Sequence, residues 1–379
     1  MTADPAVLGR RALNRALLAR QLLLERHAMP PLDAIEHLVG MQSQAPNPPY
    51  IGLWSRLADF DFDEVGELMT ARRALRIVVM RGTLHLVSAR DARALRPHTQ
   101  VILDNYVKTK AGDLDGVDLD AVVAEARRLL ADEPRTDKEL RTLLAERWPD
   151  DDAALLGWAV RCRLPLVQVP PRGIWGASGM ARHTTLDTWL DGGTPLDDDT
   201  RSDGGAPPAL SLDDLVLRYL GAFGPASVQD VQQWSGMTRL GEVVERLLPR
   251  LLVFQDENGR TLYDLPGAPR PDPDVPAPVR FVPDFDNLLL SHADRARIVT
   301  EEQRKRIFTV NGIIRATFLV DGFVHGMWKI EKKRGEAALR IDPFDPVPQR
   351  DRAALEEEGL RLLAAAHPDA KTHRVEFTR

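Results

Sequence analysis

Cysteine is nearly absent from this chain of 379 residues, which contains Cys162 alone. A single cysteine excludes an intrachain disulfide and a thiolate metal cluster, and it fits a reducing cytoplasm. No run of 18 apolar residues occurs, so we expect no membrane-spanning helix. The amphipathic, arginine-rich stretch from Val7 to Arg26 lacks an uninterrupted apolar core, which favours a folded helix over a secretory signal.

Several catalytic and cofactor motifs are missing as well. The chain has neither a phosphate-binding Gly-Xaa-Xaa-Xaa-Xaa-Gly-Lys loop nor a Rossmann glycine pattern, and it has no Gly-Xaa-Ser-Xaa-Gly nucleophile motif. Two aspartate pairs could hold a divalent ion, but turn and helix-cap roles are favoured for them. These pairs are Asp284 with Asp286 and Asp342 with Asp345. We therefore expect no metal and no other cofactor.

The net charge is also small, at −6 with an isoelectric point near 5.9, which argues weakly against a nucleic-acid partner. The acidic excess is local, because residues 187–203 hold six aspartates against one arginine. Residues 70–81 carry four arginines and no acid, and further basic clusters lie at 295–306 and 329–334. Each cluster alone is typical of a solvated surface. Together they indicate one polyanion-binding surface on an otherwise acidic chain.

The chain does contain a supersecondary unit that occurs three times, each copy with about three helices followed by a two-stranded hairpin. In the third copy, Asn258-Gly259 joins two β-rich runs and is one of the strongest hairpin signals in a sequence. The predicted elements of this copy are helices at 212–222, 228–234 and 239–248 and strands at 251–257 and 260–265. Such an arrangement of helices, helix–turn–helix and wing describes a winged-helix domain.

The other two copies follow the same plan. The second has predicted helices at 121–131, 137–147 and 153–163 and wing strands at 164–169 and 174–177. The first has predicted helices at 7–26, 32–43, 50–58 and 63–71 and wing strands at 75–80 and 83–87. The C-terminal region has predicted strands at 313–320, 323–330 and 337–341, a helix at 352–366 and an edge strand at 374–377.

The sequence therefore predicts an α+β protein with three tandem winged-helix domains and a β-rich C-terminal region. The predicted parts are winged-helix domain 1 at 1–110, winged-helix domain 2 at 111–186, an acidic linker at 187–209, winged-helix domain 3 at 210–265, a proline-rich connection at 266–283 and the C-terminal region at 284–379. Winged helices mostly bind nucleic acid, although some hold protein partners instead.

Gln42 and Gln44 occupy an unusual corner in the first copy. They close the predicted helix at 32–43, which Pro46 prevents from continuing, and two further prolines suit the first turn of the next helix. Uncharged amides at such a corner can converge on a cavity and bind a ligand. The alternative is that they cap helix carbonyls or hydrogen-bond the following loop.

Four stretches of the chain resemble the AlkZ/YcaQ family of bacterial winged-helix DNA glycosylases, over nearly the full length. These are Val39 to Trp54 with the Gln42-Ser43-Gln44 motif, Met80 to Leu86, Pro283 to Arg295 with Phe285-Asp286-Asn287-Leu288-Leu289-Leu290, and Asn311 to Trp328 with Asp321-Gly322. The Gln-Xaa-Gln motif matches the catalytic feature of the family. The last two stretches identify the family without indicating a chemical role.

The resemblance implies a C-shaped, DNA-gripping molecule that excises bulky or crosslinked alkylpurines, with Gln42 and Gln44 as the catalytic residues. One branch of the family carries Gln-Xaa-Asp. With Gln44, this chain resembles the AlkZ-type branch, which is associated with self-resistance to DNA-alkylating natural products.

The chemistry does not require a strong acid or base, because an N7- or N3-alkylated purine already carries positive charge and leaves readily. The amide oxygens of Gln42 and Gln44 can accept hydrogen bonds from a water and direct it at C1′ of the sugar. No lysine or N-terminal amine is evident as a Schiff-base nucleophile, so we predict monofunctional hydrolysis that leaves an abasic site. A crosslinked base is tied to the other strand, so we expect little base flipping.

The expected partner is double-stranded DNA with alkylated or crosslinked purines, bound by a monomer in the bacterial cytoplasm. The predicted DNA contacts are Arg81, His85, His325, Lys329, Lys332 and Lys333. The basic residues are chosen because wings and hairpins favour phosphate contact, with solubilising charge as the alternative. For the two histidines, packing or surface roles are the alternative. A non-enzymatic DNA-binding or regulatory protein is the alternative function.

Overall fold

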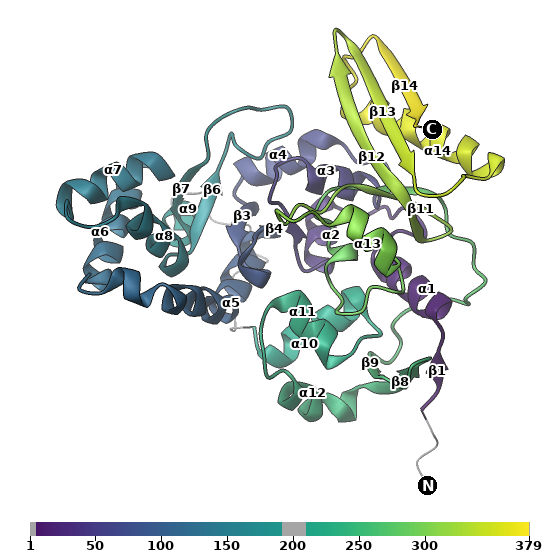
Figure 1. The fold of residues 1–379 in the computed structure, drawn as a ribbon, viewed down its shortest axis with the longest axis horizontal. Coiled ribbons are helices and arrows are strands. Elements are labelled where there is room, and N and C mark those ends of the chain that lie inside the picture. Colours follow the sequence, from purple (N-terminus) through teal and green to yellow (C-terminus); the bar gives the residue numbers. More distant parts are fainter. Residues whose placement is uncertain (1–4, 192–209, 379) are drawn as a thin grey trace.

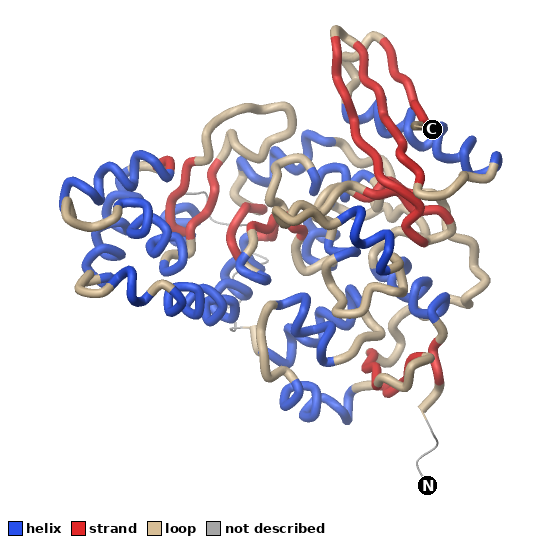
Figure 2. Tube along the Cα trace, viewed as in Figure 1, coloured by secondary structure: helices blue, strands red, loops and turns tan. Residues whose placement is uncertain are grey.

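The computed structural model of the protein describes residues 5–191 and 210–378. Helices and strands are both present along the described chain, which confirms the predicted mixed α+β class (Figure 1, Figure 2). Within the described ranges, no helix combines the length and the apolar character that a membrane span needs.

The N-terminal segment contains the Gln-Xaa-Gln motif. Its elements are β1 (Val7–Leu8), α1 (Arg10–Arg20), α2 (Pro31–His37), β2 (Met41–Gln42), α3 (Pro48–Trp54), α4 (Phe62–Thr70), β3 (Ala74–Val78), β4 (Leu84–Ser88) and α5 (Ala89–Thr109). Both α2 and α3 have proline in the first turn, where the missing N–H has no helical partner to lose. Asp61 and Glu64 form a capping box that begins α4.

The predicted helix at 32–43 is wrong in its second half. Helix α2 ends at His37, and Val39 and Gly40 adopt left-handed backbone angles with φ of 54° and 88°. An α-helix of L-residues does not continue through such angles, so the chain turns and Gln42 enters the short strand β2. The two glutamines therefore do not lie at a helix C-terminus.

The second segment forms the left side of the molecule in Figure 1. Its elements are α6 (Leu119–Asp132), β5 (Arg135–Thr136), α7 (Asp137–Arg147), α8 (Ala153–Arg163), β6 (Leu166–Val169), β7 (Arg182–Thr185) and α9 (Leu186–Asp191). Thr136 and Glu139 cap α7 reciprocally, and Asp152 caps α8. Helix α9 occupies the beginning of the predicted acidic linker, and the rest of that linker, 192–209, lies outside the described residues.

The predicted wing strand at 174–177 is also wrong, because the strand that pairs with β6 is β7, eight residues later. The intervening loop instead packs Ile174 against Gly66 and Trp175 against the rings of Tyr50 and Phe62. Because these apolar side chains pack against the N-terminal segment, this stretch does not pair with β6 as a strand.

The third segment follows the prediction closely. Its elements are α10 (Leu212–Phe223), α11 (Val228–Ser235), α12 (Gly241–Leu247), β8 (Leu252–Asp256) and β9 (Thr261–Asp264). Ser211 and Ser227 begin α10 and α11 as capping boxes, and Gly236 ends α11 with a left-handed φ of 80°. Strands β8 and β9 form the hairpin expected from Asn258-Gly259, and β1 from the N-terminus pairs with β8 in parallel.

The C-terminal region is a five-stranded sheet in the order β10-β11-β12-β13-β14, with α14 packed on it. Its elements are β10 (Arg280–Val282), α13 (Glu301–Ile307), β11 (Thr317–Val320), β12 (Phe323–Lys333), β13 (Glu336–Pro343), α14 (Gln349–Ala366) and β14 (Thr372–Phe377). The sheet therefore begins before residue 284. The long hairpin of β12 and β13 projects at the upper right in Figure 1.

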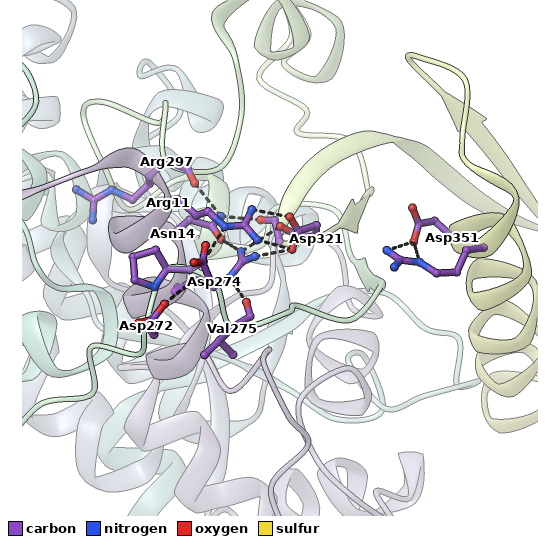
Figure 3. A network of polar contacts seen from close by, with 12 residues as sticks. Arg11, Asn14, Asp272, Asp274, Val275, Arg297, Asp321 and Asp351 are labelled. Atoms are coloured by element: carbon purple, nitrogen blue, oxygen red, sulfur yellow. Dashed lines mark hydrogen bonds and ion pairs between the residues drawn. The ribbon is translucent and has the colours of Figure 1, made fainter.

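Helix α1 binds the tight turn between β11 and β12 (Figure 3). Asn14 donates to the carbonyl oxygens of Arg297 and Gly322 at 2.9 and 2.8 Å, and Arg11 pairs with the Asp321 carboxylate at 2.6 Å. Gly322 has a φ of 82°, and a Cβ there would lie 2.5 Å from the Asn14 side chain. Only glycine fits this turn without strain.

Segments that the sequence assigns to different domains share a β-sheet and a hydrophobic core. One six-stranded sheet has the order β2-β4-β3-β6-β7-β5, so it combines strands of the first two segments. One hydrophobic cluster joins Leu17, Val79, Trp234 and Leu289, which come from three different segments. The Gln-Xaa-Gln motif lies at the β2 edge of the six-stranded sheet.

Candidate active site

The backbone places Gln42 on an edge strand with little freedom. Strand β2 pairs antiparallel with β4, and Gln42 lies opposite His85. A Cβ at Gly40 would lie 2.7 Å from Val87 Cγ1, so the close approach of the chain to β4 requires glycine. The position of Gln42 is therefore set by contacts with residues more than 40 positions away in the sequence.

Gln42 is 8% exposed, and its side-chain Oε1 accepts a hydrogen bond of 2.7 Å from Arg81 Nη2. A guanidinium can only donate, so the amide oxygen must face Arg81 and the amide NH2 group must face away. The oxygen retains one free lone pair, and the positive charge of Arg81 polarises the amide. Gln42 therefore offers both a donor and a partly occupied acceptor, whereas the sequence prediction considered its oxygen alone.

Arg81 itself is turned into the protein. Its Nη1 donates to the Trp234 carbonyl at 2.6 Å, and Nη2 also donates to Asn287 Oδ1 at 3.1 Å. Burial lowers the pKa of Arg81 to about 10, helped by repulsion from Arg295, so it remains protonated at neutral pH. The guanidinium predicted to contact phosphate is thus engaged by three internal acceptors.

Gln44, in contrast, is exposed. Its Oε1 accepts one long hydrogen bond of 3.4 Å from the Leu84 N–H. Ser43 fixes the loop between the two glutamines, because its N–H donates to Leu84 O at 2.8 Å and its side chain and carbonyl accept from Arg76 at 2.9 and 2.7 Å. The motif thus presents one buried, oriented amide and one solvent-facing amide from the same rigid loop.

A cavity of about 10 Å³ lies beside Gln42, which is about the space that one water needs. Its polar lining comes from Gln21, Gln42, Arg56, Asp284, Asp286 and Asn287. The segment Pro283 to Asn287, which the sequence linked to the family without a chemical role, is therefore a neighbour of Gln42. No local pattern in the sequence indicated that proximity.

Two polar groups of this segment are fully engaged. Asp286 receives both arms of the buried Arg56 guanidinium at 2.9 Å each, and it also caps Leu288. Asn287 donates to Gly40 O at 3.2 Å while it accepts from Arg81. Asn287 thus connects the backbone before Gln42 to the arginine that holds the Gln42 side chain.

Neither predicted histidine lies on an open surface. His85 is fully buried, and its Nδ1 donates to Thr83 O at 3.0 Å, which leaves Nε2 as an acceptor without a partner among the described residues. Burial and the nearby Arg81 lower the pKa of His85 to about 3, so it is neutral at pH 7. His325 on β12 is partly buried, with its ring centroid 6.0 Å from that of Phe318 and its Nε2 enclosed.

The predicted lysines lie along the projecting β12 strand. Lys329 is exposed and pairs with Glu331 at 2.6 Å, and Lys332 and Lys333 are exposed next to the hairpin tip. A groove of about 820 Å³ runs beside this tip. Its lining includes Lys332, Lys333, Trp175 and Asn47, the last of which follows Gln44 by three residues. The hairpin tip and Asn47 therefore line one concave surface.

The described residues contain no group of three or more histidine, cysteine, aspartate or glutamate side chains placed to hold a metal ion. The chemistry of the region around Gln42 is thus carried by amides, the Arg56–Asp286 pair, Arg81 and the carboxylate of Asp284.

Comparison with known proteins identifies the family and supports the fold. The family model of AlkZ-like DNA glycosylases matches residues 35–365. An interstrand DNA cross-link repair glycosylase of Streptomyces sahachiroi is 25% identical over 382 residues, which cover 92% of this chain and 94% of that protein. The solved structure of the Streptomyces sahachiroi DNA glycosylase AlkZ superposes with a TM-score of 0.77 at 20% identity, covering 98% of this chain and all of that one. The chain therefore belongs to the AlkZ-like family of DNA glycosylases.

Proposed function

We propose that this protein is a monofunctional DNA glycosylase that hydrolyses the N-glycosidic bond of cationic alkylated purines, including bulky adducts and interstrand crosslinks. The observation that carries the proposal is the pairing of an oriented amide, Gln42, with an exposed amide, Gln44, on one loop. Asn47, three residues after Gln44, lines a groove that also includes Lys332 and Lys333 of the projecting hairpin. The name of the Streptomyces relative, an interstrand cross-link repair glycosylase, supports the same class of substrate.

The proposed reaction uses the charge that the lesion already carries. The C1′–N bond breaks with its electron pair moving to the cationic purine, which leaves as a neutral base. Gln42 and Gln44 hold a water against the oxocarbenium-like sugar, and Arg81 prevents the Gln42 amide from rotating. Within the described chain, no lysine lines the cavity beside Gln42, which fits hydrolysis without a Schiff base.

The proposed partner is duplex DNA, bound by a monomer in the bacterial cytoplasm through three winged-helix units in a C-shaped arrangement. Lys329, Lys332 and Lys333 are the proposed phosphate contacts, because they remain exposed on the projecting hairpin. His85 is fully enclosed, and Arg81 is engaged internally, so neither belongs to the proposed DNA surface. The biological role that fits this chemistry is DNA repair and self-resistance to a genotoxic natural product.

Base release tests the proposal directly. Duplex DNA with 7-methylguanine or a nitrogen-mustard crosslink is incubated with the protein and then heated in alkali, which cleaves at abasic sites. We expect cleavage with the wild type and with Gln349→Ala, a control at an exposed glutamine on α14, and loss of cleavage with Gln42→Ala/Gln44→Ala. Absence of cleavage above the double variant, across several adducts, contradicts the proposal. Sequence-selective DNA binding without base release would instead favour a regulatory protein.

A further inference from the structure

The cavity beside Gln42 places two carboxylates next to the proposed catalytic amide, those of Asp284 and Asp286. Asp284 and Gln42 line the same space of about 10 Å³, which is about the volume that one water needs. The Asp284 carboxylate accepts a hydrogen bond of 3.0 Å from the backbone N–H of Ala316. A carboxylate has about four acceptor positions, so Asp284 can accept a further hydrogen bond from a water in the cavity.

The other polar groups in the lining are not free to take a proton. Arg56 is a cation, and Asp286 is bound by both arms of that guanidinium. Asn287 is an amide and is engaged at both ends. Asp284 has no ion-pair partner among the described residues, and the nearby charges of Arg56 and Asp286 offset one another. Gln21 and Gln42 also line the cavity, but amides have no useful basicity. Among the described residues, Asp284 is therefore the carboxylate of this lining that no arginine binds.

Hydrolysis produces a proton that amides cannot accept. When the cationic purine leaves, its positive charge is neutralised by the electrons of the broken C1′–N bond. The attacking water then forms a C1′–O bond and must lose one proton to yield the sugar hydroxyl. Glutamine has no useful basicity, so the proton passes to solvent or to a side chain that can bind it.

We propose that Asp284 is the general base of this glycosylase: its carboxylate takes the proton of the water held beside Gln42 as the water oxygen bonds to C1′. This inference rests on the proposed function. Gln42 then fixes the direction of the water, Asp284 increases its nucleophilicity, and the segment Pro283 to Asn287 acquires a chemical role. Burial raises the pKa of Asp284 above the ordinary carboxyl value, which makes it a better base near neutral pH.

The test compares single-turnover excision of 7-methylguanine by the wild type, Asp284→Asn and Asp345→Asn, with protein in excess over DNA. The amide oxygen introduced by Asp284→Asn would still accept the hydrogen bond from Ala316 N–H, so we expect DNA affinity and melting temperature close to the wild type. We expect the Asp284→Asn rate to fall by about 100-fold or more, the usual contribution of a general base. Asp345 is an exposed aspartate that follows β13, and we expect its substitution to leave the rate unchanged.

Two further readouts separate proton transfer from structural support. The wild-type rate should fall as the pH is lowered through the pKa of Asp284, whereas any residual Asp284→Asn rate should not. Formate, a small external carboxylate, should raise the rate of Asp284→Ala but not of Gln42→Ala. If the Asp284 variants fail to fold, the pH profile of the wild type still decides: a rate that stays constant as the pH is lowered from about 6.5 to about 3.9, the ordinary carboxyl pKa, overturns the proposal.

The outcome also distinguishes this inference from the function on which it rests. If the wild type releases no base from any adduct, the proposed function fails. If the wild type releases base and Asp284→Asn is within about threefold of it, only the general base is refuted, and the water loses its proton to solvent.

Discussion

Replacement of Arg81 separates two roles that a basic residue at this position could have. The guanidinium donates to Gln42 Oε1, Asn287 Oδ1 and Trp234 O at 2.7, 3.1 and 2.6 Å. Arg81→Met keeps most of the aliphatic length and removes all three donors. If Arg81 positions Gln42, the variant should lose catalytic rate without losing DNA affinity.

The magnitudes follow from the contacts. Hydrogen bonds to charged groups contribute about 1.5–3 kcal/mol each, and three in one network are not additive, so we expect about 3–5 kcal/mol less stability. An amide free to rotate misdirects the water, and misplacement of this kind costs about 10- to 100-fold in rate. Three acceptors, including the buried Gln42 oxygen, would lose their donor, which is why the stability loss accompanies the rate loss.

The assay combines three measurements on Arg81→Met and on Arg350→Met, a control that removes a charge at an 89% exposed side chain. Urea denaturation reports stability, single-turnover excision reports rate, and DNA titrations at several salt concentrations report phosphate contacts. We expect the salt dependence of binding to be unchanged. A salt slope lower by about one, together with a wild-type rate at saturating protein, would mean that Arg81 binds phosphate and would refute our reasoning.

Three further predictions address other parts of the molecule. Gly322→Ala should cost about 2 kcal/mol or more in urea denaturation, because its Cβ would lie 2.5 Å from Asn14 at a φ of 82°, and an unchanged midpoint would contradict this. Lys332→Ser/Lys333→Ser should reduce the salt slope of DNA binding by about two while excision at saturating protein stays normal. The pKa of His85 is lowered to about 3, so the unfolded state takes up the proton first as the pH falls below about 6.5 and stability decreases. Between pH 6.5 and pH 5, His85 should lower the free energy of unfolding of the wild type by about 2 kcal/mol. The His85→Asn variant lacks this group, so its free energy of unfolding should fall by about 2 kcal/mol less over the same interval, as measured by urea denaturation at both pH values.

Local signals in the sequence predicted the elements whose boundaries depend on local chemistry. The third segment is an example: Ser211 and Ser227 begin their helices, Gly236 ends one, and Asn258-Gly259 turns the β8–β9 hairpin. In each case the deciding residue lies within the element or next to it. The C-terminal hairpin around Asp321-Gly322 was predicted for the same reason.

The misplaced elements depend on distant partners. The apolar pattern from Ile35 to Val39 predicts a continuing helix. In the structure the backbone packs closely against Val87, which requires a left-handed turn at Gly40 and a strand at Gln42. Tryptophan favours β-strands, yet Trp175 packs against Tyr50 and Phe62 of the N-terminal segment instead of pairing in a sheet. Tertiary burial overrode local propensity in both places.

The candidate site was predicted only in part for a similar reason. The Gln-Xaa-Gln motif is continuous in sequence and could be recognised. The orientation of Gln42 depends on Arg81, which the sequence shows only as a basic residue in a hairpin turn. The cavity beside Gln42 depends on Asp284 and Asn287, more than 240 residues away, and no spacing rule connects them.

The contact between α1 and the β11–β12 turn has a consequence for the order in which the protein can fold. Arg11 and Asp321 are 310 residues apart, so at usual rates of synthesis α1 leaves the ribosome about 15 to 60 s before its partner exists. During that interval Arg15 and Asn14 of α1 lack the carbonyl acceptors that they have in the native state. The first helix of the chain is therefore among the last to complete its packing.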